Sequence, residues 1–490
     1  MTSLPRALLL ALSASLVACT STSDMPDAAH ADAVIAPEID APILTLDAST
    51  SDAGPLPSCG RPHATAVSID PARSERGRAL LTTERLVPRG VVPRLAMENL
   101  WIVWGTPRLT GPAYWAAFRA RYGFVEAPFA NDALPLGIQG TGDGRVTFDC
   151  LTCHAGEVAG RTLIGAANTT LDFESLYDDL VRLNELAPMF GLPSEPVPFD
   201  LDGFTTAVGV MDAFGLALRL ASSSGEVQTH FGGQRAGAWW TVRERDVLYA
   251  DGIGDASSHR TMMATLLAFG LRRDELAARE DDVESIAHFV RSIEAPCWPF
   301  DAPDEASVAR GRTHFIRECA GCHGPHEGDV FESRIIPLST IGTDPLRSAR
   351  WTEREAAWVN SNFPARETSG GSLGVTSMRD TDGYLAPPLT GIWARAPYLH
   401  NGTIPDLASL LDPASRPTRW RRTGSSEADY DAVRVGLRYE IIAASPSPDT
   451  REGRQVIDTT REGMRANGHL FGATLSVDER EDLLAYLRGL

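Results

Sequence analysis

The sequence has no excess of basic residues. Its 490 residues include 64 aspartates and glutamates against 45 lysines and arginines, so the formal net charge is −19. A nucleic-acid partner is bound through clustered Lys and Arg that neutralise phosphates. The charge balance therefore argues against nucleic acid and favours solubility and docking to basic patches on a protein partner.

Long hydrophobic runs are missing after the first twenty residues. No later segment reaches the roughly 18 uninterrupted apolar residues that a membrane-spanning helix needs. Residues 7–18 form a shorter apolar run behind a basic residue, which is the pattern of a signal-peptide core. This pattern predicts an exported protein.

The apolar run ends in Leu-Val-Ala followed by Cys19, which resembles a bacterial lipobox. We expect residues 1–19 to be a lipoprotein signal peptide whose lipidated Cys19 anchors the chain to a membrane of the periplasm. Thr20 after the cysteine favours the outer membrane by resemblance to other lipoproteins. The alternative is a plain signal peptide with an incidental cysteine.

Aromatic residues are absent from residues 20–60, which are rich in Asp, Ala, Ser, Thr and Pro. Such a segment cannot bury enough apolar surface to offset its conformational entropy. We therefore expect a flexible acidic linker between the membrane anchor and a folded part that begins at about residue 61.

Cysteine is scarce, and most of the seven cysteines have an evident role. Cys19 belongs to the lipobox and four others lie in two Cys-x-x-Cys-His motifs, which leaves Cys59 and Cys297. An exported protein meets an oxidising compartment, so this pair is a disulfide candidate. Two unpaired buried thiols remain the alternative, because the sequence does not give the distance between them.

Two copies of Cys-x-x-Cys-His carry the clearest chemistry in the chain. In this pentapeptide two thiols bond covalently to the vinyl groups of haem, and the adjacent His binds the iron. A zinc site would need further Cys or His at ligand spacing, and a thioredoxin-like pair would need a strand–helix context. We therefore predict two covalently bound haem c groups, held by Cys150, Cys153 and His154 and by Cys319, Cys322 and His323.

Helical patterns surround both motifs. Residues 279–293 have an amphipathic pattern that ends near Pro296, and residues 306–318 lead directly into Cys319. Ser476 and Glu479 predict a capping box at the start of a final helix with an apolar stripe. The fold expected is mainly α, with two cytochrome c-like haem domains at residues 61–299 and 300–490 and long irregular loops.

Residues 384–405 read YLAPPLTGIWARAPYLHNGTIP. This run resembles a segment of di-haem cytochromes related to the bacterial cytochrome c peroxidases, and in particular the di-haem rubber oxygenases. The resemblance extends over roughly residues 95–490. It implies a haem-containing redox protein, but kinship at the level of the fold does not fix one reaction.

The resemblance also suggests the second ligand of the C-terminal haem. In the peroxidases this ligand lies just before a run that residues 470–476 match, and His469 occupies that position here. His469 is therefore the first choice, although it could be a surface His. His400 is the alternative ligand, and it could instead bind a haem propionate or brace its loop.

The N-terminal haem has weaker candidates. Trp239 and Trp240 resemble the Trp that lies between the haems in these families, although both could be ordinary aromatic core. His259, Met262 and Met263 lie where the rubber oxygenases keep an apolar Phe. This departure puts oxygenase activity in doubt, so Trp240 and His259 are weak catalytic candidates and the methionines could be core filler.

Two functions follow from these patterns. The first is an exported, lipid-anchored electron-transfer protein that exchanges electrons with a redox partner protein or a small donor or acceptor. The second is a haem peroxidase or oxygenase in which the N-terminal haem reacts and the C-terminal haem relays electrons. The second axial ligand of each iron decides between them, because an open position admits O₂ or peroxide.

Overall fold

The computed structural model describes residues 68–490, apart from residues 88, 192–193, 198–200, 202, 223–224, 267–274, 277, 327, 329 and 363–377. All described residues belong to one compact unit, Gly54–Leu490. The predicted signal peptide with Cys19 and the predicted linker with Cys59 lie outside them. Within the described residues, no helix combines the length and the apolar character needed to cross a membrane.

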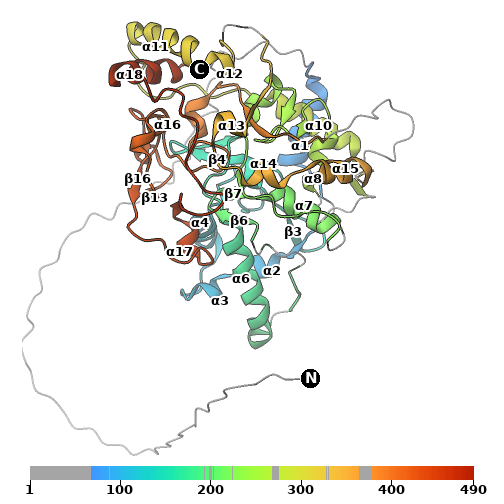
Figure 1. Cartoon of the computed structure of the whole chain (residues 1–490). Helices are drawn as coiled ribbons and strands as arrows, with labels where there is room; N and C mark the ends of the chain where they lie inside the picture. The colour runs from blue at the N-terminus through green and yellow to red at the C-terminus, as the bar shows by residue number, and fades with distance from the viewer. Residues whose placement is uncertain are drawn as a thin grey trace, which may run out of the picture. The chain divides into compact units, whose positions relative to one another are not determined.

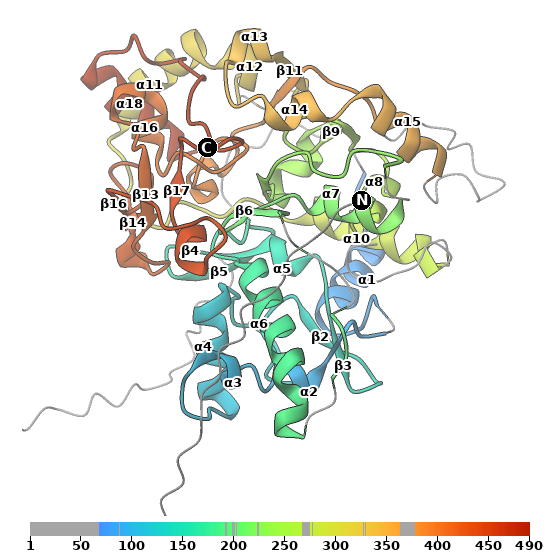
Figure 2. The same ribbon diagram turned by 60° about the horizontal axis from the view of Figure 1, so that its bottom comes forward.

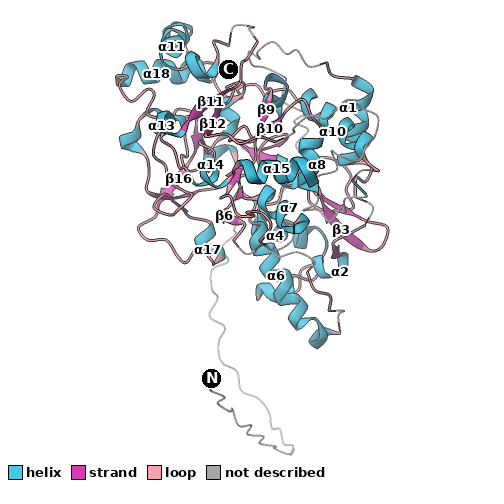
Figure 3. Cartoon of the chain, turned by 45° about the vertical axis from the view of Figure 1, so that its right-hand side comes forward, coloured by secondary structure: helices cyan, strands magenta, loops and turns pink. Residues whose placement is uncertain are grey.

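Helices supply most of the regular structure, and short antiparallel strands lie between them (Figure 3). The α-helices are α1 (Pro71–Thr82), α2 (Arg94–Met97), α3 (Trp101–Trp104), α4 (Gly111–Tyr122), α5 (Leu151–His154), α6 (Phe173–Leu186), α7 (Ala213–Ala221), α8 (Arg260–Leu266), α10 (Glu280–Ser292), α11 (Glu305–Glu318), α12 (Ala320–His323), α13 (Leu338–Ile341), α14 (Leu346–Arg350), α15 (Glu353–Asn362), α16 (Leu407–Leu411), α17 (Arg451–Arg454) and α18 (Val477–Leu487). The 3₁₀ helices are η1 (Ala187–Phe190), η2 (Trp239–Glu244), η5 (Ile392–Arg395), η6 (Pro413–Ser415) and η7 (Glu427–Asp429).

The strands form sheets of two or three members, in the orders β1-β3-β2, β4-β5, β6-β7-β8, β10-β9, β11-β12, β16-β13-β17 and β14-β15. Their bounds are β1 (Val92–Pro93), β2 (Ile138–Gly140), β3 (Arg145–Phe148), β4 (Ala155–Val158), β5 (Arg161–Ile164), β6 (Thr205–Ala207), β7 (Val210–Met211), β8 (Gln234–Arg235), β9 (Val247–Leu248), β10 (Gly254–Asp255), β11 (Arg334–Pro337), β12 (Gly383–Ala386), β13 (Arg419–Arg422), β14 (Tyr430–Asp431), β15 (Gly436–Leu437), β16 (Tyr439–Ile441) and β17 (Ile457–Asp458). The mainly α prediction is thus confirmed in part, because small sheets make the fold mixed.

Helices α1 and α10 pack against each other (Figure 1). The amphipathic pattern predicted at residues 279–293 becomes α10, which buries Ile286, Phe289 and Val290. A Cβ atom on Gly77 of α1 would lie 2.2 Å from the carbonyl oxygen of Ser285. Since real Cβ atoms do not approach so closely, glycine is what allows the two helix backbones to meet.

Helices α11 and α18 form a second pair of the same kind (Figure 2). A Cβ atom on Gly311 of α11 would lie 1.9 Å from the carbonyl oxygen of Asp482 in α18. Arg310 donates two hydrogen bonds to the Asp482 carboxylate, at 2.7 and 2.8 Å. The predicted capping box of Ser476 and Glu479 is present at the start of α18. The final helix predicted from the sequence is therefore confirmed.

Two hydrophobic clusters of the described residues extend across the predicted domain boundary, whereas a third lies within residues 61–299. One cluster joins Leu80 and Ile286 to Trp351, and another joins Trp240 to Phe315 and Leu487. Segments from both sides of residues 299/300 therefore share each of these two cores, although the boundary itself falls between α10 and α11. The division into two haem domains, 61–299 and 300–490, stays a prediction.

Candidate functional site

Both Cys-x-x-Cys-His motifs line one cavity of about 410 Å³. Its lining includes all three motif residues from each copy: Cys150, Cys153, His154, Cys319, Cys322 and His323. The four thiols are free. Burial raises the pKa of Cys150, Cys153 and Cys319 to about 12. The fold thus brings the two distant Cys-x-x-Cys-His motifs to one cavity, with their thiols not engaged in disulfides.

The first motif begins directly after strand β3. The Asp149 carboxylate accepts a hydrogen bond from the Leu151 backbone N–H at 2.7 Å and so helps to start α5. At the end of α5, Nδ1 of His154 donates to the carbonyl oxygen of Gly237 at 3.0 Å. A ligand His commonly donates its other ring N–H in this way, which leaves Nε2 for the metal. Burial lowers the pKa of His154 to about 4, so the ring is neutral at pH 7 and able to bind a metal.

The second motif repeats this arrangement at α12. Nδ1 of His323 donates to the carbonyl oxygen of Pro387 at 2.7 Å. Burial and, to a smaller extent, the charge of Arg395 lower the pKa of His323 to about 4. Each motif His is therefore held by a backbone carbonyl from a distant loop, with the same nitrogen left available.

His469 lies close to His323 in the cavity, with the two ring centres 6.3 Å apart. A metal–imidazole nitrogen bond is about 2 Å long, and the ring centre lies about 1 Å beyond the nitrogen. Two imidazoles on opposite sides of one metal ion would therefore have their centres about 6 Å apart. The separation of His323 and His469 matches that requirement.

Both backbone polar groups of His469 form hydrogen bonds. Its N–H donates to the carbonyl oxygen of Ile341 at 2.7 Å, and its carbonyl oxygen accepts from Arg416 at 3.1 Å. The side-chain Nδ1 is buried and has no hydrogen-bond partner among the described residues. Burial, assisted by His323, lowers the pKa of His469 to about 3. A neutral, oriented and unsatisfied imidazole in this place fits an iron ligand.

His400 also lines the cavity but has a different neighbour. Its ring stacks on Tyr384, with centres 4.1 Å apart and planes 16° from parallel. Burial lowers the pKa of His400 to about 3, with contributions from the charges of Arg347 and Arg235. The geometry favours His469 over His400 as the partner of His323, while both assignments stay predictions.

Trp240 and His259, the two weak catalytic candidates near the first motif, are not among the residues that line the cavity. Trp240 donates its indole N–H to the carbonyl oxygen of Thr390 at 3.0 Å and packs in a neighbouring core. His259 Nε2 lies 3.0 Å from a carboxylate oxygen of Glu280. Trp239 does line the cavity, and its ring stacks on His154 with centres 5.0 Å apart. Of the tryptophan pair, Trp239 is thus the one next to the motif.

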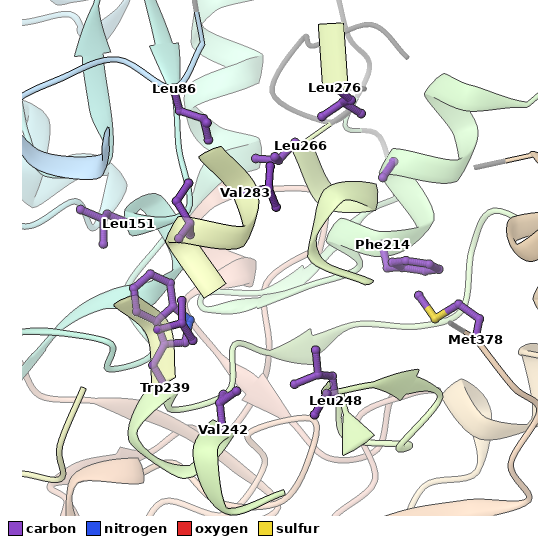
Figure 4. Close-up of a cluster of buried hydrophobic side chains, with 14 of the residues drawn as sticks. Leu86, Leu151, Phe214, Trp239, Val242, Leu248, Leu266, Leu276, Val283 and Met378 are labelled. Carbon is purple, nitrogen blue, oxygen red and sulfur yellow. The ribbon is translucent and has the colours of Figure 1, made fainter. Parts of the chain in front are cut away.

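The wall around the first motif is mostly apolar. Figure 4 shows part of it, and the cavity-lining residues labelled there are Phe214, Trp239, Val242, Leu248, Leu266 and Val283. Two thioethers, those of Met211 and Met262, also line the cavity. The side chain of Met263 lies outside the described residues. This part of the lining is therefore mainly apolar, as expected for a buried cofactor pocket.

Three arginines in the cavity lining were not predicted: Arg235, Arg245 and Arg395. They are scattered along the chain and belong to no spacing pattern, so the sequence contains no signal for them. Only Arg395 lies within the run of residues 384–405 that carries the family resemblance.

Cys297 is disulfide-bonded, in contrast to the four motif cysteines. Cys59 lies outside the described residues. The Cys59–Cys297 pairing therefore stays a prediction, as does lipidation of Cys19.

Comparison with known proteins agrees with the cytochrome character of the chain. A family model described as RoxA-like, cytochrome c-like matches residues 383–421, which include the whole run YLAPPLTGIWARAPYLHNGTIP. This match supports a cytochrome c related to the rubber oxygenases, and hence a haem-binding redox protein.

Two proteins of Sinorhizobium fredii (strain NBRC 101917 / NGR234) are similar to the chain. The uncharacterized protein y4iM is 30% identical over 250 residues, which cover 47% of this chain and 55% of the relative. The uncharacterized protein y4iJ is 26% identical over 259 residues, which cover 40% of this chain and 41% of the relative. The chain thus spans about half the length of the relatives it matches.

Proposed function

We propose that the protein is an exported, lipid-anchored di-haem cytochrome c that transfers electrons. The observation that carries this proposal is the shared cavity, where both Cys-x-x-Cys-His motifs present free thiols and a His oriented by a backbone carbonyl. The cytochrome c-like match at residues 383–421 supports covalent haem c. Bound haem supplies reversible one-electron chemistry at iron.

The residues of the chain then have distinct roles. Cys150 and Cys153 would hold one haem through thioether bonds, and Cys319 and Cys322 would hold the other. His154 and His323 would each supply a neutral imidazole to the iron of their own haem. His469 would supply a second imidazole to the C-terminal haem, and two imidazole ligands would make that haem a low-spin electron carrier.

The number of haems tests this proposal directly. Protein produced with a cytochrome c maturation system should give a pyridine haemochrome ratio of two haems per chain. A ratio of one would show that one of the two motifs does not attach haem, and a ratio of zero would refute the proposal.

The proposed membrane anchor has its own test. The variant Cys19→Ser should move the protein from the membrane fraction to the soluble fraction of the periplasm, because the acyl chains supply the membrane affinity. Cys297→Ser is the control that alters a cysteine without altering the lipobox. Equal fractionation of Cys19→Ser and the parent would refute the anchor.

A second candidate function is peroxidase or oxygenase chemistry at the N-terminal haem. The observation that favours it is the surrounding of His154, where the ring contact is with Trp239 and the nearby cavity wall is mostly apolar. An iron without a second strong ligand can bind O₂ or peroxide. Ferric absorption and EPR spectra distinguish the two functions, because a high-spin signal from one haem favours the enzyme and two low-spin signals favour the carrier.

A further inference from the structure

The cavity contains an arginine cluster, defined as Arg235, Arg245 and Arg395, whose charges are incompletely matched. Arg235 Nη1, Arg245 Nε and Arg395 Nε are buried and have no hydrogen-bond partner among the described residues. Arg395 is only 7% exposed. Glu244 is the carboxylate whose charge acts on Arg245 and Arg395, and it also accepts a hydrogen bond from Thr390 at 2.9 Å. Arg245 and Arg395 thus share one nearby carboxylate, and the charge of Arg235 acts on Arg395 as well.

The arginine cluster is connected to the loops that hold both motif histidines. Arg235 donates from Nε to the carbonyl oxygen of Leu399 at 3.0 Å, and two residues later Gly237 accepts the hydrogen bond from His154. Arg395 donates from Nη1 to the carbonyl oxygen of Pro388 at 2.7 Å, next to Pro387, which accepts from His323. The cluster therefore adjoins the proximal support of each predicted haem.

The positive charge of the arginine cluster would be stabilised by a bound anion. Burial and, to a smaller extent, the charges of Arg235 and Arg245 together lower the pKa of Arg395 to about 9. Burial also lowers the pKa of Arg235 and of Arg245 to about 10. All three are still protonated at neutral pH. An unpaired charge in an apolar cavity is costly, so a ligand that brings negative charge here would stabilise the site.

We propose, building on the di-haem function above, that the arginine cluster binds haem propionates and forms one carboxylate-binding site shared by the two haems. The planar guanidinium fork matches a carboxylate in geometry and charge. Each haem carries two propionates, so two haems bring enough negative charge to balance the cluster. The same carboxylate chemistry could come from a dissolved organic acid, and the experiment separates the two sources.

The test uses the full chain with both haems attached and the variants Arg395→Gln and Arg235→Gln. Haem content is measured first, since a deficit in the parent would refute the di-haem function rather than the propionate site. The midpoint potentials of both haems are then measured by spectroelectrochemistry, together with the resonance Raman bands of propionate bending.

We expect both variants to keep two haems, because the thioether bonds are unchanged. At least one potential should shift to a more negative value, since removal of a nearby cation favours the ferric state. The propionate bands should also shift. Arg395→Lys keeps the charge but not the fork, so its potential should shift less than that of Arg395→Gln.

The matched control is Arg421→Gln, which removes a half-exposed arginine of β13 that pairs with Glu440 at 2.9 Å. It should leave potentials and propionate bands unchanged. Arginine-cluster variants with two haems, parental potentials and parental propionate bands would overturn the proposal. Parent potentials that depend on added acetate would assign the cluster to dissolved carboxylate and also overturn it. If a glutamine variant does not accumulate in the cell, the propionate bands of Arg395→Lys are compared with those of the parent instead. A shift of these bands would support the proposal, and parental bands would overturn it.

Discussion

Around the second motif, the His469 ring lies across from His323, whereas around the first motif the ring next to His154 is the indole of Trp239. The two sites are otherwise built alike. Each motif His donates Nδ1–H to a distant carbonyl oxygen, at 3.0 Å for His154 and 2.7 Å for His323. The difference therefore lies in which ring is next to the motif His and not in how the motif is held.

The helical frameworks show the same likeness. Gly77 lets α1 meet α10, and Gly311 lets α11 meet α18. However, α11 runs directly into Cys319, while α2–α4 and the sheet β1-β3-β2 intervene between α1 and Cys150. Two helix pairs of the same kind with different inserted segments thus give the two motif histidines unlike surroundings.

The largest effect is expected from removing one attachment site at a time. The double variant Cys150→Ser/Cys153→Ser should lower the haem ratio from two to one and leave a purely low-spin ferric spectrum, because in the proposed arrangement His323 and His469 would both bind the remaining iron. Cys319→Ser/Cys322→Ser should also leave one haem, but with the spectrum of the first site. Pyridine haemochrome and EPR measurements check both variants, and identical spectra would abolish the proposed difference between the sites.

Removal of the proposed second ligand should make the two sites more alike. His469→Ala should convert one haem from low-spin to high-spin while the haem ratio stays at two. EPR of the ferric protein measures this change. His400→Ala is the control, since its ring stacks on Tyr384. A high-spin signal from His400→Ala alone would move the ligand assignment to that residue.

The two helix crossings can be compared by adding one methyl group to each. Gly311→Ala and Gly77→Ala should each lower the free energy of unfolding by about 1–3 kcal/mol, because the new Cβ would overlap a backbone carbonyl. Thermal or denaturant unfolding measures the loss. Gly142→Ala is the control, because the nearest heavy atom to the Cβ position of this exposed glycine is Nη1 of Arg85, at 3.8 Å. If Gly77→Ala left the free energy of unfolding unchanged while Gly311→Ala lowered it, the two helix pairs would differ in how closely they need to pack.

The smallest effect is expected from the aromatic neighbour of His154. Trp239→Phe should alter the absorption spectrum of the first haem slightly and leave the second unchanged, because the ring stacks on His154. Difference spectra of the one-haem variants measure it. Trp240→Phe is the matched control, since its indole packs in the neighbouring core and donates to Thr390. Equal spectral changes in both variants would contradict a special role for Trp239.

The sequence by itself determined the features that depend on neighbouring residues. The residues that predict covalent haem attachment are five consecutive positions, so both motifs can be recognised without a structure. Helices α10 and α18 follow from hydrophobic periodicity and a capping box, which are also local signals. The resemblance at residues 384–405 coincides with the family match at residues 383–421.

Only the tertiary structure decided which of these features meet. It brought two motifs more than 150 residues apart into one cavity, placed His469 rather than His400 across from His323, and turned Trp239 rather than Trp240 toward His154. It also gathered Arg235, Arg245 and Arg395, which share no pattern in the sequence. Periodicity and spacing report contacts within one helix or turn, whereas these contacts depend on how distant segments of the chain pack. Trp239 and Trp240 are neighbours at the start of η2, and only the packing of η2 decides which of the two side chains lines the cavity.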